Sequence, residues 1–579
     1  MEKERAKRRT MAVNFLAFFK RTPLYNLSCY RIWERKREYV TMVKVNVEGS
    51  EGRKVKKDTV HMLKRAERFH VILIGEGLLV GSVAGLIVLA YRIALKYAGQ
   101  WLEAVRHYIG NSPVKAAMWF CLLFLMATAV GLLIKWEPMI SGSGIPQLEG
   151  EMSGKLNQTW WKVLPAKFIG GFLSLLAGLS LGREGPSIQL GAMTGKGISK
   201  ALDRGKTEEK ILLTCGASAG LSAAFHAPLA GVMFSLEEVH KNFSVSVLVS
   251  VMTASISADY LSSQFIGIEP VFQFDIGHVL PQNYYWLIIV LGVILGVLGS
   301  VYNRFTLKVQ SLYKQSKRLN EVTKVMIPFM LSGVLILVMP ELLGSGHELI
   351  DSLTNHELLL GGAIVILIGK FLFSAVCFGS GAPGGIFFPL LVLGAFVGGI
   401  FGMIGVNYFG MDPDYINNFV MLAMAGNFTA IVRAPLTGII LIFEMTGSVS
   451  QMLSLSVVSI VAYVVASLLG SEPIYESLLE RLLKNNGEET TEGIKGQKIL
   501  ISHVIMHGSP LAHRKVQEID WPQNCLLVSI KRGDKEVIPK GKTVLLPSDM
   551  LVTLTDEKDE PYVRECVEKL CKMKQEEKR

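Results

Sequence analysis

The sequence predicts an all-α polytopic membrane protein that ends in a small α+β domain. Half of its 579 residues are hydrophobic and only 19% are charged, with a mean hydropathy of +0.37; soluble proteins carry about 25% charged residues. Long apolar runs recur along the chain, and several motifs return at a nearly constant offset. After about residue 485 the pattern changes to short alternating runs typical of strands.

Six apolar runs have the length that a bilayer demands. About 20 helical residues span the roughly 30 Å of hydrocarbon. A large soluble enzyme would bury one or two such runs, whereas here they make up most of the chain. The runs are Val71–Ala94, Ala116–Ile134, Tyr285–Val301, Val325–Val338, Leu358–Phe378 and Leu453–Leu469.

Residues 1–69 form a basic segment that we expect to be cytoplasmic. Residues 1–70 contain 19 Lys and Arg against 8 Asp and Glu, and the first apolar run follows directly. Positive residues beside a first span stay on the cytoplasmic side. No signal-peptide pattern is visible, and the choice between Met1 and Met42 as the true start stays open. We interpret the segment as a solvated tail, with no nucleic-acid role.

The sequence offers no enzyme motif. The seven cysteines form no CxxC pair, and no His cluster completes a zinc pattern, so we predict no metal site. The glycines of Ile74–Gly85 have GxGxxxG spacing, one residue too long for the dinucleotide fingerprint, and no strand precedes them. No Walker lysine or Ser–His–Asp arrangement is present. We therefore expect no cofactor and no enzymatic activity.

The membrane part, predicted at residues 70–484, repeats itself. "PMISGSG" from Pro138 matches "PELLGSG" from Pro340, an offset of 202. "GREGPSIQLGAMTG" and "GIFFPLLVLGAFVG" share GxxxPxxxLGAxxG at offset 203, and "APLAGVMFSLE" and "APLTGIILIFE" match at offset 207. Matches in one order at nearly one offset predict two homologous halves, about 70–270 and 280–470, typical of transporters.

The remaining chain is predicted as a linker, residues 485–496, and a cytoplasmic α+β module, residues 497–579. Three runs read as strands, and a charged amphipathic helix is expected over Glu560–Lys574. The three runs are Cys525–Gly533, Thr543–Asp549 and Met550–Asp556.

Three Gly- or Pro-rich breaks in the two halves point to an anion site. A helix N-terminus has free N–H groups and about half a positive charge. Several such ends aimed at one centre bind an anion without a full cation, and broken helices inside a membrane are tolerated where they line a cavity. Small residues can also serve helix packing alone, but three breaks spread over both halves favour the ion site. The breaks are Gly142–Pro146 (with Gly142, Ser143, Gly144 and Pro146), Gly182–Pro186 (with Gly182, Arg183, Gly185 and Pro186) and Gly384–Pro389.

Glu184 lies where this geometry favours an anion. Its carboxylate can occupy the site in competition with the ion, and on protonation it loses that attraction and can leave. One residue would then gate the path and carry a proton. The alternative is an ion pair with Arg183, although adjacent residues need not face each other.

Glu237 and Glu238 form a second acidic pair at the end of an apolar segment. Carboxylates inside a membrane are functional hypotheses by default. A segment end can also lie at the wet interface, where carboxylates are ordinary. The residues alone leave these two interpretations equally open.

These motifs, together with "EPIYESLL" from Glu472, resemble the CLC chloride channels and transporters over about residues 70–485. The resemblance implies two inverted-topology repeats of short, tilted and broken helices, and a homodimer in which each subunit has its own pore.

The resemblance also implies residue roles. Ser143 and Tyr475 would bind chloride through their hydroxyls, and Ile386 and Phe387 through their backbone N–H groups. Glu184 would be the external gate and Glu238 the internal glutamate of proton coupling. Lys167 resembles a basic residue that raises the local potential.

The resemblance favours a chloride/proton exchanger. Serine at position 143 resembles chloride-preferring members rather than nitrate- or fluoride-selective ones. A carboxylate at Glu238 resembles the exchangers, since passive channels usually lack it. A passive voltage- or pH-gated chloride channel on the same scaffold remains the alternative.

Residues 497–574 resemble the TrkA-C domain, with the likeness carried by Leu526–Asp556. That implies a dimerising module which binds a nucleotide-like regulatory ligand; a dimerisation domain with no ligand is equally open. By association the source is a prokaryote, with the protein in its inner membrane and both termini cytoplasmic. The expected partners are a second copy, the lipid bilayer and small anions.

Overall fold

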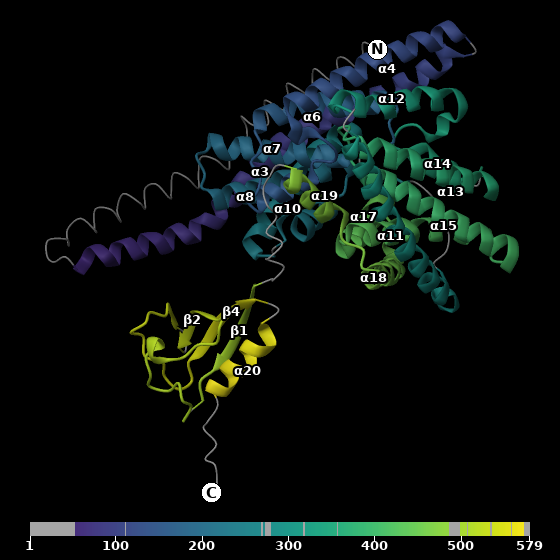
Figure 1. Cartoon of the computed structure of the whole chain (residues 1–579). Coiled ribbons are helices and arrows are strands. Elements are labelled where there is room, and N and C mark those ends of the chain that lie inside the picture. The colour runs from purple at the N-terminus through teal and green to yellow at the C-terminus, as the bar shows by residue number, and fades with distance from the viewer. Residues whose placement is uncertain are drawn as a thin grey trace.

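The computed structural model describes residues 52–571, except 111, 242, 268–269, 273–279, 317–318, 356, 486–497, 507, 533–534 and 557–558. The helical part ends at residue 485, and the α+β domain begins at residue 498 (Figure 1). Most of the predicted basic segment (1–51) and nearly all of the predicted linker (485–496) lie outside the described residues.

The helical part consists of two series of helices that match one to one. The first series is α3 (Gly52–Ile109), α4 (Pro113–Trp136), α5 (Ile145–Met152), α6 (Trp160–Leu176), α7 (Glu184–Ala201), α8 (Lys206–Phe225), α9 (Pro228–Phe234), the π-helical turn η2 (Ser235–His240) and α10 (Val245–Ile266). The second is α11 (Tyr285–Gln315), α12 (Glu321–Val338), α13 (His347–Thr354), α14 (Leu360–Gly379), α15 (Phe387–Phe409), α16 (Ile416–Val432), α17 (Pro435–Thr446) and α18 (Met452–Leu468), followed by α19 (Ile474–Asn485).

Equivalent helices pack in equivalent ways. Helix α7 lies against α8 as α15 lies against α16, and α3 lies against α10 as α11 lies against α18. Across the halves α4 contacts α12, α9 contacts α17 and α7 contacts α15. Because each of these helices meets its own counterpart, a twofold axis relates the halves. The sequence repeat is therefore also a structural repeat.

The first helix is longer than the apolar run that predicted it. Helix α3 begins at Gly52, about 20 residues before the run Val71–Ala94. The added residues include four Lys and three Arg, which are good helix formers, and contain no proline. The basic segment next to the span therefore continues the helix.

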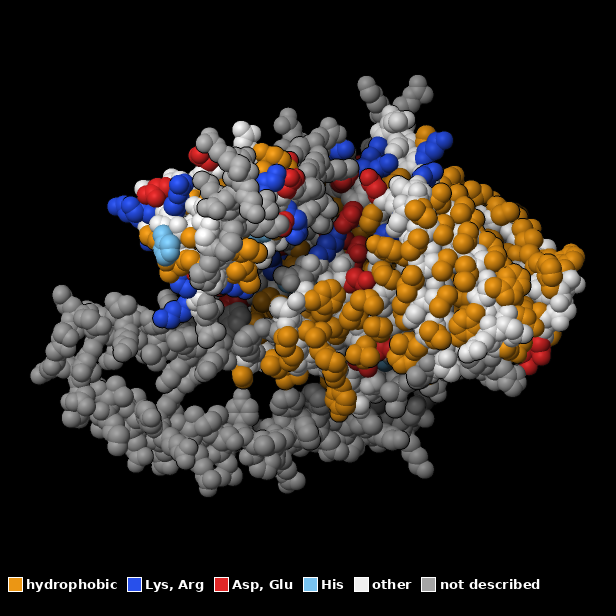
Figure 2. Space-filling view, turned by 90° about the horizontal axis from the view of Figure 1, so that it is seen from below, with side chains coloured by type: hydrophobic (Ala, Val, Ile, Leu, Met, Phe, Trp, Pro, Cys, Tyr) orange, Lys and Arg blue, Asp and Glu red, His pale blue; other side chains and the backbone are white. Residues whose placement is uncertain are grey.

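Helices α15 and α16 form the centre of the helical part. In the most apolar 18-residue window of each helix, 78% of the residues are buried in α15 and 94% in α16. The corresponding share is 33–44% in the five other long apolar helices. Within the described residues seven helices are long and apolar enough to cross a bilayer. Hydrophobic side chains also cover much of the outer surface (Figure 2). An apolar exterior around a packed centre suits a body solvated by lipid.

The C-terminal domain is a four-stranded sheet with one helix. Strands β1 (Lys498–Val504), β2 (Leu526–Arg532), β3 (Lys535–Val537) and β4 (Met550–Asp556) pair antiparallel in the order β1-β4-β2-β3, and α20 spans Glu560–Cys571. Ile501, Ile530 and Leu551 of the sheet form a core with Val563 and Val567 of α20.

The strand predicted over Thr543–Asp549 is wrong. Its pairing is limited to an isolated bridge of Val544 with Lys515 and the backbone hydrogen bonds of the neighbouring Thr543 and Leu545. The rest is a turn, in which the Asp549 carboxylate accepts a hydrogen bond from the Leu546 N–H at 2.8 Å and Ser548 has φ +69°. The alternating pattern there produces no strand because the side chain of Asp549 holds the backbone in the turn.

Candidate functional site

The first break places Ser143 just before a short helix. Gly142 and Gly144 adopt φ +64° and +91°, a region that side chains rarely reach, so the turn requires glycine. Helix α5 then begins at Ile145 with Pro146 as its second residue, a position that suits proline. Ser143 is 2% exposed, and its Oγ accepts a hydrogen bond from the Ile145 N–H at 3.3 Å.

The second and third breaks meet directly. Gly182 and Gly385 exchange backbone hydrogen bonds of 2.6 and 2.7 Å in an antiparallel bridge between the halves. Helix α7 begins two residues after Gly182, at Glu184, and α15 begins two residues after Gly385, at Phe387. The bridge therefore holds the N-termini of α7 and α15 side by side.

The first break packs against the second. A Cβ on Gly185 would lie 2.6 Å from the Ser143 carbonyl oxygen and 2.9 Å from its Cβ. Only glycine permits this approach of Ser143 to the first turn of α7, which also contains Pro186. The structure thus brings all three Gly/Pro breaks to one place.

The Glu184 side chain lies between these helix ends. Its carboxylate is fully buried, and Oε2 accepts a hydrogen bond from the Phe388 N–H at 3.4 Å. The other oxygen has no hydrogen-bond partner among the described residues. No ion pair with Arg183 forms in this part of the chain; the Arg183 guanidinium lies 5.8 Å from the centre of the Phe225 ring. Glu184 therefore occupies an N-terminal position of the kind that binds anions.

Ile386 and Phe387 stand at the beginning of α15. Both are fully buried, with Ile386 as the N-cap and Phe387 as the first residue. The Phe387 ring packs against Phe428 at 4.8 Å and Phe225 at 5.6 Å between ring centres. These ring contacts hold the helix end in place, while the first N–H groups of a helix have no partner within it.

Tyr475 is the second residue of α19, which packs against α5. Its side chain is fully buried, and its hydroxyl has no hydrogen-bond partner among the residues that the structure describes. The phenol is close enough to interact electrostatically with both Glu184 and Glu238. Tyr475 therefore links the neighbourhoods of the two candidate acids.

Lys167 is fully buried and donates hydrogen bonds to the backbone. Its Nζ lies 2.8 Å from the Ile140 oxygen and 2.7 Å from the Gly142 oxygen. Its counterpart Lys370, 203 residues later, donates in the same way to the oxygens of Leu342 and Gly344 at 3.0 and 2.7 Å. The symmetry indicates that each lysine holds the glycine turn of its own half.

Glu237 and Glu238 have different surroundings. Glu237 accepts hydrogen bonds from the N–H groups of Leu436 and Thr437, at the start of α17, at 3.3 and 2.8 Å. Its counterpart Glu444 caps the start of α9 in the same manner, at 3.0 and 2.7 Å. This reciprocal capping is structural.

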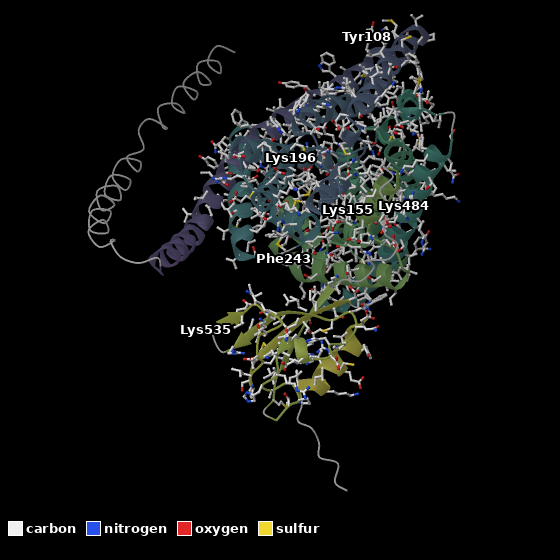
Figure 3. All side chains as sticks on the ribbon, turned by 60° about the vertical axis from the view of Figure 1, so that its left-hand side comes forward. Tyr108, Lys155, Lys196, Phe243, Lys484 and Lys535 are labelled. Carbon is white, nitrogen blue, oxygen red and sulfur yellow. The ribbon has the colours of Figure 1, made fainter. Side chains whose placement is uncertain are left out.

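Glu238 has no such partner. It is 6% exposed, and one of its oxygens lacks any hydrogen-bond partner within the described part of the chain. Phe243, shortly after η2, and Tyr108, at the end of α3, lie at opposite ends of the helical part (Figure 3). Phe243, five residues after Glu238 in the sequence, thus marks the end of the helical part opposite to Tyr108.

Sequence reasoning missed three residues of this region. Phe388 supplies the N–H that binds Glu184, Glu149 faces Glu238, and Lys370 supports the second turn. The repeat offset could have found Lys370, because Lys167 lies 203 residues before it. The predicted break Gly384–Pro389 contains Phe388 but gives no sign that its N–H binds Glu184, and no local pattern identifies Glu149, because both contacts form only in the folded chain.

Comparisons with known proteins agree with this geometry. Residues 125–467 match the voltage gated chloride channel family, and residues 500–565 match the TrkA-C domain. The chain is 35% identical over 450 residues to an H(+)/Cl(-) exchange transporter ClcA of Vibrio cholerae serotype O1 (strain M66-2), covering 75% of this chain and 94% of that protein. It is 33% identical over 447 residues to the ClcA transporter of Salmonella agona (strain SL483), covering 75% and 93%.

Solved structures show the same fold. The crystal structure of a slow cyanobacterial Cl-/H+ antiporter matches with a TM-score of 0.68 and 32% identity, over 71% of this chain and 98% of that one. A eukaryotic CLC transporter matches with a TM-score of 0.60 and 19% identity, over 78% and 80%, which supports the fold alone. The predicted CLC fold followed by a small α+β domain is confirmed. The chain belongs to the voltage-gated chloride channel (CLC) family and ends in a TrkA-C domain.

Proposed function

We propose that this protein exchanges chloride for protons across a membrane. One observation carries the proposal: the buried Glu184 carboxylate accepts a hydrogen bond at the N-terminus of α15, where free N–H groups favour an anion. A side chain that already fills an anion position competes with a transported anion. The names of the relatives from Vibrio cholerae and Salmonella agona support the same function.

The chloride site would lie among the converging helix ends. The Ser143 and Tyr475 hydroxyls and the N–H groups of Ile386 and Phe387 are its proposed ligands. Partial charges of this kind stabilise a dehydrated halide without a fixed cation that would hold it too tightly. Because serine at position 143 resembles the chloride-preferring members of the family, we expect the site to prefer chloride over nitrate and fluoride.

Protons would move between Glu184 and Glu238. A proton on Glu184 removes its charge, so the carboxyl is no longer attracted to the end of α15 and an anion replaces it. Glu238 would exchange protons with the opposite solution, and its burial supports a role in coupling rather than a wet surface. The second candidate is a passive chloride channel on the same scaffold, in which Glu184 gates without net proton movement.

The assembly and orientation follow from the same proposal. The protein would be a homodimer with one pore per subunit, and the N-terminal charge bias supports cytoplasmic termini. The TrkA-C domain would regulate transport, either by binding a nucleotide-like ligand or by dimerising. The protein would act as a transporter without enzymatic activity.

Simultaneous measurement of chloride and proton fluxes in liposomes tests the function. At fixed chloride concentrations an exchanger's reversal potential shifts with the transmembrane pH difference, whereas a passive channel shows no shift. Glu238→Gln should lose proton flux and retain chloride flux. A wild-type protein with no pH-dependent shift would exclude exchange and leave the channel.

A further inference from the structure

Glu149 and Glu238 bring two carboxyl groups into contact in a buried position. Glu149 lies on α5 and Glu238 on η2, two elements that pack together, and the two acids are close enough to interact electrostatically. They are 5% and 6% exposed. Both Glu149 oxygens and Oε1 of Glu238 are buried with no hydrogen-bond partner among the described residues.

Two ionised carboxylates cannot share this contact. A carboxylate only accepts hydrogen bonds, so the pair can bond only when one member carries a proton. Two like charges in contact in a poorly solvated site repel strongly, and one of them then keeps its proton. The contact therefore requires at least one proton.

The surrounding charges do not remove this requirement. Lys241 is the cation that faces the pair, and it is already matched by Glu476 of α19, with 2.5 Å between Nζ and Oε1. Both members of this ion pair are about half exposed, at 43% and 50%. Tyr475 of α19 faces the carboxyls as a neutral phenol. The dyad thus lies between a solvent-exposed ion pair and the buried tyrosine.

The repeat shows that the scaffold does not need this contact. The position equivalent to Glu238 in the second half is Met445, which is fully buried, and that equivalent to Glu149 is Asp351 on α13. The capping glutamates Glu237 and Glu444, in contrast, are present in both halves. Only the first half therefore has two acids at these positions. The second half has the carboxylate of Asp351 and the thioether of Met445.

We propose that Glu149 and Glu238 hold one shared proton and that Glu149 passes protons between the Lys241–Glu476 side and Glu238. In the transfer the O–H bond of Glu149 breaks and an O–H bond forms on a Glu238 oxygen, with the negative charge moving to Glu149. A proton from solution then restores Glu149. The dyad rests on the proposed exchange function and adds a second proton carrier to it.

Glu149→Gln tests the dyad in reconstituted full-length protein. Glutamine still hydrogen-bonds to Glu238 but cannot release a proton, so proton flux should fall about tenfold or more while chloride flux is retained. Glu149→Asp should recover part of the proton flux. Asp351→Asn, at the equivalent position of the other half, is the matched control and should keep the wild-type coupling ratio.

The outcomes separate the two proposals. Wild-type coupling together with normal proton flux in Glu149→Gln overturns the dyad and leaves the exchanger intact. A wild-type protein that moves no protons with chloride overturns both. Should Glu149→Gln fail to fold, infrared spectra of wild type and Glu238→Gln decide: the dyad requires a protonated-carboxyl band whose frequency shifts in Glu238→Gln, because the acceptor of the shared proton changes from a carboxylate to an amide, and a spectrum in which no protonated-carboxyl band changes overturns it.

Discussion

Gly182→Ala should displace the Glu184 carboxylate, the proposed gate, while leaving the acidic group itself in place. A Cβ at position 182 would lie 2.0 Å from Glu184 Oε2 and 3.1 Å from the Phe388 nitrogen. Gly182 does not require a positive φ, and its hydrogen bonds to Gly385 use the backbone, so alanine is compatible with the local fold. The atom that must move is Oε2, at the end of the flexible Glu184 side chain.

The expected loss of competition between the Glu184 carboxylate and chloride follows from the contact with the added Cβ. Restoring an ordinary 3.4 Å contact moves the carboxylate by about 1.4 Å, which breaks its 3.4 Å hydrogen bond to the Phe388 N–H. A hydrogen bond to a charged group is worth about 1.5–3 kcal/mol, and each 1.4 kcal/mol is tenfold. The carboxylate should therefore compete with chloride about ten- to hundredfold less well.

Chloride binding and coupled flux measure this effect. Calorimetry on the purified protein should give tighter chloride binding in Gly182→Ala, and liposome fluxes should give fewer protons per chloride. Gly361→Ala is the control, because nothing lies within 4 Å of its Cβ position. Wild-type affinity and coupling in Gly182→Ala would refute the competition between Glu184 and the anion.

Three further predictions concern the scaffold and the C-terminal domain. Glu444→Ala removes the cap of α9 and should cost about 1–2 kcal/mol of stability, seen as a lower thermal midpoint in detergent; an unchanged midpoint would contradict the capping role. Lys167→Met and Lys370→Met should each destabilise by about 1–3 kcal/mol. The first removes the lysine hydrogen bond of the Ile140 carbonyl while Gly142 keeps its bond from the Gly384 N–H, and the second removes those of the Leu342 and Gly344 carbonyls. If the Lys167 charge also raises the potential of the site, only Lys167→Met should weaken chloride binding in calorimetry. Burial alone would raise the pKa of Asp549, but hydrogen bonds from Arg532 and the Leu546 N–H outweigh it and hold that pKa below its ordinary value. Its stabilising contribution should be complete above the ordinary value of about 3.9 and lost as pH falls through the lower folded pKa. Hydrogen exchange of β2 and β4 in the full-length protein should show this loss in wild type and not in Asp549→Asn; equal acid sensitivity of the two proteins would contradict it.

The sequence by itself determined the class of the protein and the location of its breaks. Hydrophobic runs, the offsets of 202–207 residues and the Gly/Pro motifs are local or periodic signals, and they correctly predicted two related helical halves followed by an α+β domain. Local signals also singled out Ser143 and Glu184, because charge and glycine are conspicuous in apolar surroundings. The proposed roles of these residues come from the family resemblance and await the experiments above.

Only the tertiary structure decided which groups meet. The bridge between Gly182 and Gly385 and the bond from Phe388 to Glu184 join residues about 200 positions apart, and the contact of Glu149 with Glu238 joins residues 89 positions apart. Such contacts depend on how whole helices pack, which no short window of sequence contains. The predicted strand over Thr543–Asp549 was wrong for a related reason. Alternation records side-chain burial, but the backbone turns at Leu546–Asp549, where the Asp549 carboxylate binds the Leu546 N–H, before the pairing of Thr543–Leu545 can extend into a strand.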